Sequence, residues 1–576
     1  MSWELKEQLK QIRRQETGEP IFFTRGRSPM ALAYPNSYHV GMSNLGLHII
    51  YQQVNRRGDT ACERFFLPDS RTRAEHRRTN TPLLSVETQQ PLHQFPLIAF
   101  AVSFEMDYFN LLEMLELGRV PLLAAERDER HPLVIIGGPC ATFNPEPLAD
   151  FVDLCVVGEG EEVIHELLDT YYQGREQNLS RRELLLRLAA LKGIYVPSFY
   201  QPVYSAEKRF SGMETLAAVP AKIERRWIRD LDRYPAEAVI FTENTEFKDM
   251  FLMEVARGCG RHCRFCMAGY CFRRPRNRSL DVLQQAVKRA GEFRKKVGLV
   301  GAAISDYPEI NELCGWIRRQ DMGLSVASLR ADSLTPELVA ALKDSGHRTL
   351  TLAPEAGSER MRRVINKGLD EQTLLRAVDM AMAAGIPHIR LYIMIGLPEE
   401  RDEDLAAIVR LALTVKNRMR GSGGHGRLTL SVNPFIPKPF TPFQWSPMAL
   451  QQEVTAKIKQ LQHEFKQVKG IELLVESPRE AYVQAVLARG DRRLGAVLKD
   501  AVAAGGVKGW KSAMKQQGLE AADYLYRFRT PDEMFPWEVL QPGVDRAYLW
   551  QEYQRAGEEL FTEPCHSACH RCGVCH

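Results

Sequence analysis

Cys259, Cys263 and Cys266 lie on one short stretch of the chain in the spacing C-x3-C-x2-C. Three thiolates on one loop can each hold one iron of a 4Fe–4S cluster, which leaves the fourth iron open to a substrate or cofactor. A zinc knuckle is the alternative. Zinc sites usually pair two short arms of ligands, however, and no second arm lies within 30 residues. The spacing therefore favours an iron–sulfur cluster with an open iron.

A second group of cysteines closes the chain in the spacing C-x3-C-x2-C-x2-C: Cys565, Cys569, Cys572 and Cys575. Four thiolates at this spacing are enough for a closed 4Fe–4S cluster or a tetrahedral zinc ion. The possible substitute ligands are His566, His570 and His576. A closed cluster could relay electrons to the cluster of the first cysteine group, whereas zinc would only stabilise the fold of the tail. The remaining alternative is a tail that binds no metal.

Length, charge and cysteine usage bound the class of protein. A chain of 576 residues should hold three or four domains, and its net charge of +4 gives no case for binding nucleic acid. The N-terminus has no apolar signal core, and no run of 18 apolar residues predicts a membrane span. Twelve cysteines in such a chain indicate metal and a reducing compartment, so we expect a cytoplasmic protein.

The elements that must position these cysteines begin with a charged helix and loop over residues 1–28. Residues 29–172 then alternate apolar strands with amphipathic helices, which predicts a doubly wound parallel sheet. Such sheets bind ligands beyond the carboxyl ends of their strands, where Gly-rich turns fall here. Residues 173–245 are mixed and are predicted to be a linker with a few short strands.

A second series of strands and helices spans residues 246–445, and its first strand leads into the first cysteine group. Six strands in repeated βα units predict a partial (β/α)6 barrel with its site at the carboxyl ends of the strands. Residues 446–562 are expected to be mainly helical, and residues 563–576 form the cysteine-rich tail. The predicted fold class is therefore α/β.

The first cysteine run resembles a family signature, because the aromatic Phe265 stands directly before Cys266. It is similar to the C-x3-C-x-aromatic-C motif of radical SAM enzymes. The resemblance implies that the open iron chelates S-adenosylmethionine and that the reduced cluster cleaves it to a 5′-deoxyadenosyl radical. It also implies an electron donor such as flavodoxin or ferredoxin. The substrate is unknown, and no catalytic group beyond the cofactors is assigned.

The resemblance implies further contacts to S-adenosylmethionine. The backbone at Phe265 would meet adenine, and Ser328-Leu-Arg330 resembles the Ser-x-Arg that meets ribose and carboxylate. The Gly-Gly-Glu segment of many members is absent, so Ser305 and Asp306 are the polar candidates after the second strand. The implied binding set is Phe265, Ser305, Ser328, Arg330, Glu355 and Gly396.

A basic run follows the first cysteine group and consists of Arg273, Arg274, Arg276 and Arg278. A solvated loop is the favoured interpretation, because proline interrupts the run. The alternative is a clamp for a substrate that carries phosphate or carboxylate.

Residues 34–42, 136–139 and 157–161 resemble segments of the cobalamin-binding, Rossmann-like domain of a large radical SAM class. With Ser-Phe-Glu at 103–105 and the C-terminal cysteines, the whole chain is similar to an uncharacterised bacterial group in that class. The resemblance implies a corrin bound near Ser103, Gly137, Gly138 and Gly158. The Asp-x-His-x-x-Gly sequence that supplies a cobalt ligand elsewhere is missing, and His39 does not fit it. The alternative is a Rossmann-like domain that only shapes the substrate pocket.

The expected function is cobalamin-dependent radical methylation of an unactivated carbon. A cobalamin-independent radical SAM enzyme is the first alternative, and a non-catalytic iron–sulfur or nucleic-acid-binding protein is the second. Methylthiotransferases have a similar domain order but carry three N-terminal cysteines for a second cluster. The N-terminal cysteines here are Cys62, Cys140 and Cys155, and Cys155 lies inside an apolar strand, which counts against that class.

Overall fold

A computed structural model describes residues 2–18, 21–421, 425–566 and 568–575. The chain divides into two compact units, each built from segments that are distant in the sequence. Unit 1 comprises Met1–Lys248, Val486–Ala521 and Asp532–Pro542. Unit 2 comprises Asp249–Ala485, Ala522–Pro531 and Gly543–His576. The region 446–562, which the sequence presents as one helical stretch, therefore contributes to both units.

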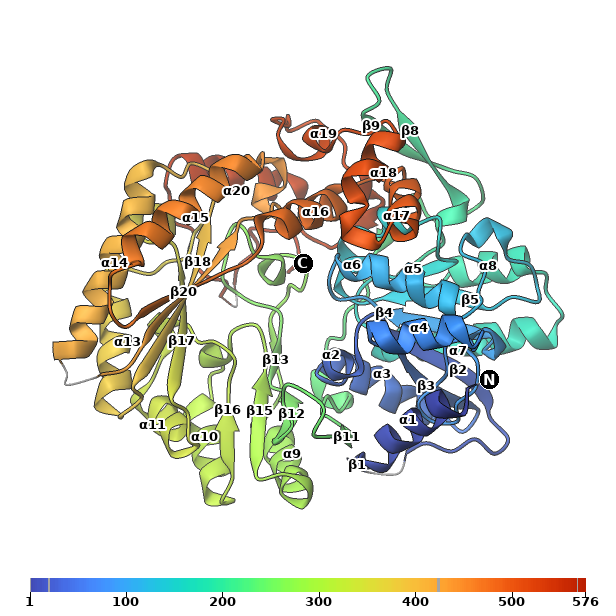
Figure 1. Ribbon diagram of the computed structural model, residues 1–576, viewed down its shortest axis with the longest axis horizontal. Helices are drawn as coiled ribbons and strands as arrows, with labels where there is room; N and C mark the ends of the chain where they lie inside the picture. Colours follow the sequence, from blue (N-terminus) through green and yellow to red (C-terminus); the bar gives the residue numbers. More distant parts are fainter. Residues whose placement is uncertain (1, 19–20, 422–424, 567, 576) are drawn as a thin grey trace. The chain divides into compact units, whose positions relative to one another are not determined.

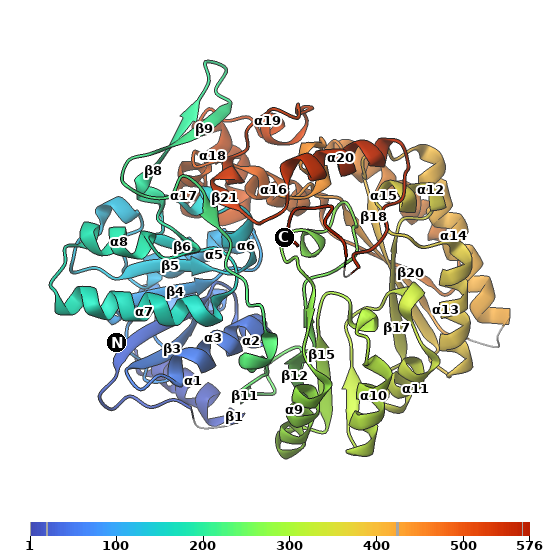
Figure 2. The ribbon, with the colours of Figure 1, turned by 180° about the vertical axis from the view of Figure 1, so that it is seen from behind.

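Unit 1 is built on a sheet with the strand order β3-β2-β4-β5-β6-β7. Its strands are β2 (Ser28–Tyr34), β3 (Thr60–Phe66), β4 (Leu97–Ala101), β5 (Leu133–Gly137), β6 (Leu154–Val156) and β7 (Ile194–Tyr195). Neighbouring strands are parallel except at the β6–β7 edge. Helices α4 and α5 lie in front of the sheet in Figure 1, and α7 lies in front in the reverse view of Figure 2. The predicted doubly wound sheet is confirmed.

The helices of unit 1 are α1 (Trp3–Arg14), α2 (Tyr38–Met42), α3 (Leu45–Asn55), α4 (Ser70–Arg78), α5 (Asp107–Leu117), α6 (Pro139–Phe143), α7 (Gly160–Glu176), α8 (Arg181–Ala189), α17 (Leu494–Ala503) and α18 (Trp510–Gln516). Half of them begin at a side-chain cap, as at Asn44, whose amide oxygen accepts from the Leu47 N–H. The late helix α17 packs on α5, so the last quarter of the chain returns to cover the early sheet.

The predicted linker over 173–245 is more ordered than a linker. Helix α8 and strand β7 complete the sheet of unit 1. Beyond them, β8 (Tyr200–Tyr204) and β9 (Phe210–Thr215) form a hairpin. The short β10 (Ile223–Glu224) pairs with β21 (Leu540–Gln541), and β11 (Ile240–Phe241) pairs with β1 (Thr17–Gly18).

Unit 2 contains the predicted partial barrel. Its strands are β12 (Met250–Glu254), β15 (Lys296–Val300), β16 (Gly323–Ser325), β17 (Thr349–Glu355), β18 (His388–Ile395), β19 (Leu428–Pro434) and β20 (Ile471–Val475). They form two parallel sheets, which a single parallel bridge from Leu329 to Leu352 joins. Strand β20, in the region expected to be helical, extends the predicted six-strand series at the β19 edge. The α/β fold class is confirmed.

The helices of unit 2 cover the outer side of these strands (Figure 1). They are α9 (Leu280–Phe293), α10 (Ile310–Arg319), α11 (Pro336–Asp344), α12 (Glu359–Val364), α13 (Glu371–Ala383), α14 (Asp402–Gly421) and α15 (Gln451–Phe465). Helix α16 (Pro478–Arg489) crosses the boundary between the units, as does α19 (Ala521–Leu525). Helix α20 (Arg546–Gly557) precedes the tail. In the described part of the chain, no helix has the length and apolar character that a membrane span requires.

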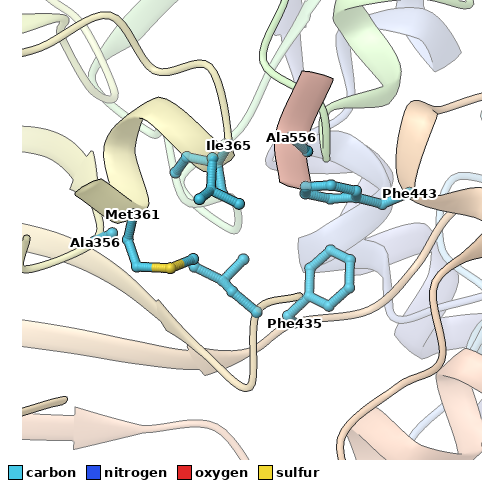
Figure 3. Packing of buried hydrophobic residues seen from close by; sticks show 8 residues of the cluster. Ala356, Met361, Ile365, Phe435, Phe443 and Ala556 are labelled. Atoms are coloured by element: carbon cyan, nitrogen blue, oxygen red, sulfur yellow. The ribbon is translucent and has the colours of Figure 1, made fainter. Parts of the chain in front are cut away.

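Helix α20 is fixed to the barrel by a buried apolar cluster. Figure 3 shows Ala556 of α20 beside Phe443, with Met361 and Ile365 of the α12 region close by. Phe435, which follows β19, stacks edge-to-face on Phe443 with ring centroids 5.6 Å apart. This packing anchors the element that leads directly into the C-terminal cysteines.

Candidate functional site

The cluster loop, residues 258–271, follows β12 at the carboxyl end of a barrel strand. Gly258 opens it with φ +81°, and a Cβ there would lie 2.1 Å from the carbonyl oxygen of Phe272. Only glycine fits this position, because both the backbone angle and the space exclude a side chain. The tight entry directs the following cysteines toward the end of the barrel where such folds carry their sites.

The three thiols of the cluster loop are free and largely shielded from water. Cys263 is buried, and Cys259 and Cys266 are half-buried. Burial raises the pKa of Cys259, and burial together with the neighbouring thiols raises the pKa of Cys266 to about 12. Thiols in this setting become thiolates readily only when a bound cation supplies compensating positive charge. The site therefore fits a metal centre better than a nucleophilic thiol.

Among the described residues, no three His, Cys, Asp or Glu side chains lie close enough together to hold one metal ion. A 4Fe–4S cluster makes a different demand, because each thiolate binds a different iron at a separate corner. The C-x3-C-x2-C cysteines, Cys259, Cys263 and Cys266, fit such a cluster with one open iron, and Cys271, the fourth cysteine of the cluster loop, is buried outside that spacing.

The side chains between the cysteines hold the loop in place. Arg264 is fully buried and donates hydrogen bonds to the carbonyls of Arg363 and Val364, both at 2.9 Å, and to Leu560 at 2.7 Å. The side chain of Phe265 packs against the apolar cluster of Figure 3. These side chains anchor the loop, and the predicted contact of the Phe265 backbone with adenine stays a prediction.

An ion-pair network crosses the carboxyl ends of the next strands. Arg261 donates two hydrogen bonds to Asp306, at 2.9 and 2.8 Å, and a third to Asp332 at 3.0 Å. Arg330 donates to both oxygens of Asp332 at 2.9 Å. Burial raises the pKa of Asp306, but the hydrogen bonds and charge of Arg261 outweigh burial, and the net pKa lies below its ordinary value. The residues after β15 and β16 are therefore tied to the cluster loop.

The network continues to the end of β17. Arg330 donates to the carbonyl of Lys367 at 2.9 Å, and the Lys367 ammonium donates to Glu355 at 3.2 Å. Glu355 has φ +66°, an unusual conformation for this residue. Lys367 thus connects Arg330 and Glu355, the two residues that are both predicted to contact S-adenosylmethionine. Sequence reasoning missed Arg261, Asp332 and Lys367, because their partners are distant along the chain.

The other predicted contacts lie at the same barrel end without joining this network. Ser305 is buried, and its hydroxyl accepts from Ser333 at 2.8 Å. Ser328 is exposed after β16. Gly396 follows β18 with φ +73°, and its N–H donates to both oxygens of Glu400 at 3.1 Å. Their roles in binding stay predictions.

The favoured interpretation of the basic run was wrong. Arg273, Arg276 and Arg278 are buried, and only Arg274 is exposed. Arg278 donates to Glu254, the last residue of β12, at 2.8 Å, and Arg257 donates to the same carboxylate at 2.9 Å. Most of the run is therefore internal, and the carboxylate of Glu254 at the end of β12 compensates the charge of Arg278.

The C-terminal tail lies against the cluster loop within unit 2. The N–H of Cys565 donates to the carbonyl of Gly260 at 2.8 Å, and the Cys565 thiol lies 3.5 Å from Nε2 of His262. His262 is 1% exposed, and its Nδ1 lies 2.5 Å from the hydroxyl of Tyr548 on α20. The structure thus brings together the two cysteine groups that the sequence keeps about 300 residues apart.

Three of the tail thiols interact with one another. Burial raises the pKa of Cys565 to about 11, opposed by Arg273 and reinforced by Cys569 and Cys572. Arg571 donates to the Cys569 sulfur at 3.3 Å. Of the histidines considered as substitute ligands, His570 Nδ1 lies 2.9 Å from the carbonyl of Cys575, His566 is exposed, and His576 lies outside the described residues.

In unit 1 the predicted corrin contacts lie after three neighbouring strands. Ser103 follows β4 and accepts from the Asn44 amide at 3.3 Å. Gly137 ends β5, and Gly138 has φ +96° with Val102 O only 2.8 Å from an added Cβ. Gly158 follows β6 with φ +108° and bridges to Arg226. The two left-handed glycines allow close backbone packing, and corrin binding at these residues stays a prediction.

Sequence reasoning missed a polar cluster at the switch point of this sheet. The chain passes from β2 outward to β3 and then returns to β4 on the other side, and ligands bind at such reversals. There the amides of Asn36 and Asn110 donate to Asp107 at 2.8 and 3.2 Å. Burial raises the pKa of Asp107 to about 6, although both amides oppose the shift. An Asn directly after a strand was the available sequence signal.

Comparisons with known proteins agree with this geometry. A family model described as Radical SAM proteins, N-terminal, matches residues 46–197, and one described as Radical SAM superfamily matches residues 253–412. An uncharacterized protein of Methanocaldococcus jannaschii is 29% identical over 469 residues, which cover 81% of this chain and 89% of the relative. An uncharacterized methyltransferase of Pyrococcus horikoshii is 25% identical over 301 residues, which cover 50% of this chain and 59% of the relative.

Among solved structures, the radical S-adenosylmethionine methyltransferase TsrM from Kitasatospora setae is similar with 13% sequence identity and a TM-score of 0.47. The match covers 92% of this chain and 96% of that chain. The two family models include strands β3 to β7 of unit 1 and, in unit 2, the cluster loop with strands β15 to β18. The chain belongs to the radical SAM superfamily of enzymes.

Proposed function

We propose that this radical SAM enzyme methylates an unactivated carbon of its substrate in a cobalamin-dependent reaction. The proposal rests on the combination of two features in one chain. The cluster loop carries the C-x3-C-x2-C cysteines, and the switch point of the doubly wound sheet holds polar side chains. The relative from Pyrococcus horikoshii, which is named a methyltransferase, supports the reaction type.

When bound, the 4Fe–4S cluster and S-adenosylmethionine supply a 5′-deoxyadenosyl radical, and cobalamin supplies the methyl group. Cys259, Cys263 and Cys266 would hold the cluster. Arg330 suits the methionine carboxylate, which would take the place of Asp332 on its planar fork of two parallel hydrogen bonds. Glu355 lies where its carboxylate can accept from an amine or from ribose hydroxyls. The buried side chains around the loop exclude water from the site.

The switch point of unit 1 suits the edge of a corrin. Asn36, Asn44 and Ser103 supply amide and hydroxyl groups for its polar side chains, and Phe104 is 44% exposed beside them. An exposed ring at a sheet end offers an apolar surface to a flat ligand. His39 is not a cobalt ligand of the familiar motif, and its Nδ1 lies 3.2 Å from Asn244.

The burial of the cysteines of unit 1 is evidence against a methylthiotransferase. Cys62 lies in β3, Cys155 in β6 and Cys140 in α6, and all three are buried. Burial raises the pKa of Cys62 and of Cys155 well above the ordinary value. They are core residues of a sheet rather than ligands gathered on a loop.

Anaerobic reconstitution with iron, sulfide and hydroxocobalamin tests the proposal. We expect about one cobalt per chain, formation of 5′-deoxyadenosine from S-adenosylmethionine, and methylcobalamin on the protein. The triple variant C259A/C263A/C266A should lose 5′-deoxyadenosine formation, whereas Cys314→Ala, a buried cysteine of α10, should keep it.

A pair of variants locates the corrin. Ser103→Leu should lower the cobalt retained per chain, and Leu216→Ala, an exposed apolar residue after β9, should leave it unchanged. Formation of 5′-deoxyadenosine without retained cobalt would favour the cobalamin-independent alternative. Absence of both iron and S-adenosylmethionine cleavage would contradict the enzyme and favour a non-catalytic protein.

A further inference from the structure

We propose that Cys565, Cys569, Cys572 and Cys575 hold a second iron–sulfur cluster that is fastened to the cluster loop and passes single electrons to the first cluster. The inference rests on the radical SAM activity proposed for the cluster loop. It assigns the tail a place in that activity, as the entry for the electron that the reaction consumes.

A continuous path of bonds connects the two cysteine groups. Cys259 is bonded to Gly260, and the Gly260 carbonyl accepts the N–H of Cys565 at 2.8 Å. An added Cβ on Gly260 would lie 3.5 Å from Cβ of Cys565, so the two backbones are in close contact. One hydrogen bond and a few covalent bonds thus connect a ligand of the first cluster to a ligand of the second. Electrons cross such a path more readily than an equal distance through space.

Hydrogen bonds hold the segment that leads into the tail. Asn366 donates from its amide to the carbonyls of His262 and Thr562, at 3.1 and 3.0 Å, and accepts from the Thr562 N–H at 2.8 Å. The Thr562 hydroxyl donates to Glu552 at 2.7 Å. The residue before the tail is therefore fixed to the cluster loop itself, which keeps the distance between the two cysteine groups constant.

Positively charged side chains surround the tail thiols. Arg273 interacts with Cys565 and hydrogen-bonds to Cys572, and Arg571 donates to Cys569. Positive groups and hydrogen bonds to the sulfurs stabilise the reduced state of a cluster, which carries one more negative charge. Cys569 and Cys572 are 4% and 2% exposed, whereas Cys575 is half-buried and offers the accessible edge. This arrangement suits electron transfer, and a structural zinc ion would not require it.

The electron count is simple. A reduced one-electron carrier protein, of the flavodoxin or ferredoxin class, gives one electron to the tail cluster and is oxidised. The tail cluster returns to its oxidised state when it reduces the first cluster, and no bond changes in either transfer. The electron finally enters S-adenosylmethionine, whose sulfur–carbon bond breaks to give methionine and the 5′-deoxyadenosyl radical.

The experiment compares wild type with the double variant C569A/C572A and with Cys314→Ala as the matched control. We expect about eight irons per chain in wild type and control and about four in the double variant. Reduced flavodoxin should reduce the first cluster of the double variant roughly tenfold more slowly. Titanium(III) citrate, a small reductant that needs no docking site, should reduce it at the wild-type rate. Electron paramagnetic resonance follows each reduction.

A measurement on wild type alone guards against loss of the first cluster in the variant. The fully reduced protein should show magnetic interaction between two clusters, because the two cysteine groups that would hold them are in contact at Gly260 and Cys565. Zinc in place of the second set of irons, two signals without interaction, or an unchanged rate with flavodoxin would each overturn the relay. Failure of wild type to form 5′-deoxyadenosine with titanium(III) citrate would instead count against the proposed function.

Discussion

Arg264 and Glu552 form a buried ion pair that joins the cluster loop to α20. Their side chains are 0% and 2% exposed, and Arg264 Nε lies 3.1 Å from the carboxylate. Burial lowers the pKa of Arg264, and the charge of Glu552 opposes that shift. Because Arg264 directly follows Cys263, a contact 288 residues away in sequence fixes the geometry of a cluster ligand.

Glu552→Ala should destabilise the protein by about 3–5 kcal/mol, because it leaves a buried guanidinium without its counter-charge. The measurements are the thermal unfolding midpoint and the iron retained after reconstitution, both of which should fall. Asp344→Asn is the control. It breaks an ion pair with Arg318 whose side chains are about half exposed, and such pairs contribute at most about 1 kcal/mol. Equal effects of the two variants would contradict the role of the buried pair.

Gly258→Ala should prevent normal cluster assembly, because the added methyl group would meet the Phe272 carbonyl at 2.1 Å and the backbone angle is left-handed. We expect less iron per chain and loss of the cluster absorbance. Gly291→Ala, inside α9 with Met322 Sδ 3.9 Å away, should load iron normally. Full iron loading in Gly258→Ala would show that the cluster loop can form with a different backbone conformation at position 258.

Arg330→Ala should raise the dissociation constant for S-adenosylmethionine about tenfold, because the site loses a charge-assisted fork for the carboxylate. The dissociation constant of Arg330→Lys should lie between those of Arg330→Ala and wild type, since lysine keeps the charge but not the fork. Calorimetric titration of the reconstituted protein measures both. Arg318→Ala, a half-exposed arginine of α10, is the control. An unchanged constant in Arg330→Ala would remove this residue from the binding set.

Asp107 should make stability depend on pH in a defined direction. Its pKa is about 6 in the folded protein against an ordinary value of 3.8, so the folded state holds the proton more tightly. Its contribution is fully present below about pH 4 and is lost as pH rises through about 6. Asp107→Asn removes this dependence. The variant should therefore gain about 3 kcal/mol over wild type between pH 4 and pH 8.

Denaturant unfolding of both proteins at these two pH values measures that difference. The comparison with wild type cancels other titrating groups, because only one carboxyl changes. A difference that does not vary with pH would mean that Asp107 is ionised normally in the fold.

The cluster loop, and the succession of a doubly wound sheet and a partial barrel, could be predicted from the sequence. Both depend on residues that are close together along the chain. The spacing of Cys259, Cys263 and Cys266 is covalent, and strand periodicity is local. Strand β3 was missed, because Glu63 and Arg64 interrupt its apolar run. The structure buries Arg64 by pairing it with Glu87 at 2.6 Å and with Glu16 at 2.8 Å, partners that no local pattern reveals.

The contacts of the tail show the same limit. The spacing of its cysteines predicts a metal site, but nothing local indicates that Cys565 meets Gly260. The burial of the arginines after the cluster loop is equally hidden from the sequence, because the carboxylate that pairs with Arg278, that of Glu254, lies on the preceding strand. Charge compensation across distant segments is a tertiary property, and a run of like charges alone favours solvent.

The return of Val486–Ala521 and Asp532–Pro542 to unit 1 has a consequence for folding during synthesis. Trp510 stacks edge-to-face on Phe109 at 5.8 Å, and Asn144 donates to the carbonyls of Ala488 and Gly490. These partners of the early sheet are synthesised only after all the barrel strands. The apolar face of α5 therefore stays exposed until the later segments have been synthesised. A fragment that stops at residue 248 should bind chaperones or aggregate rather than fold.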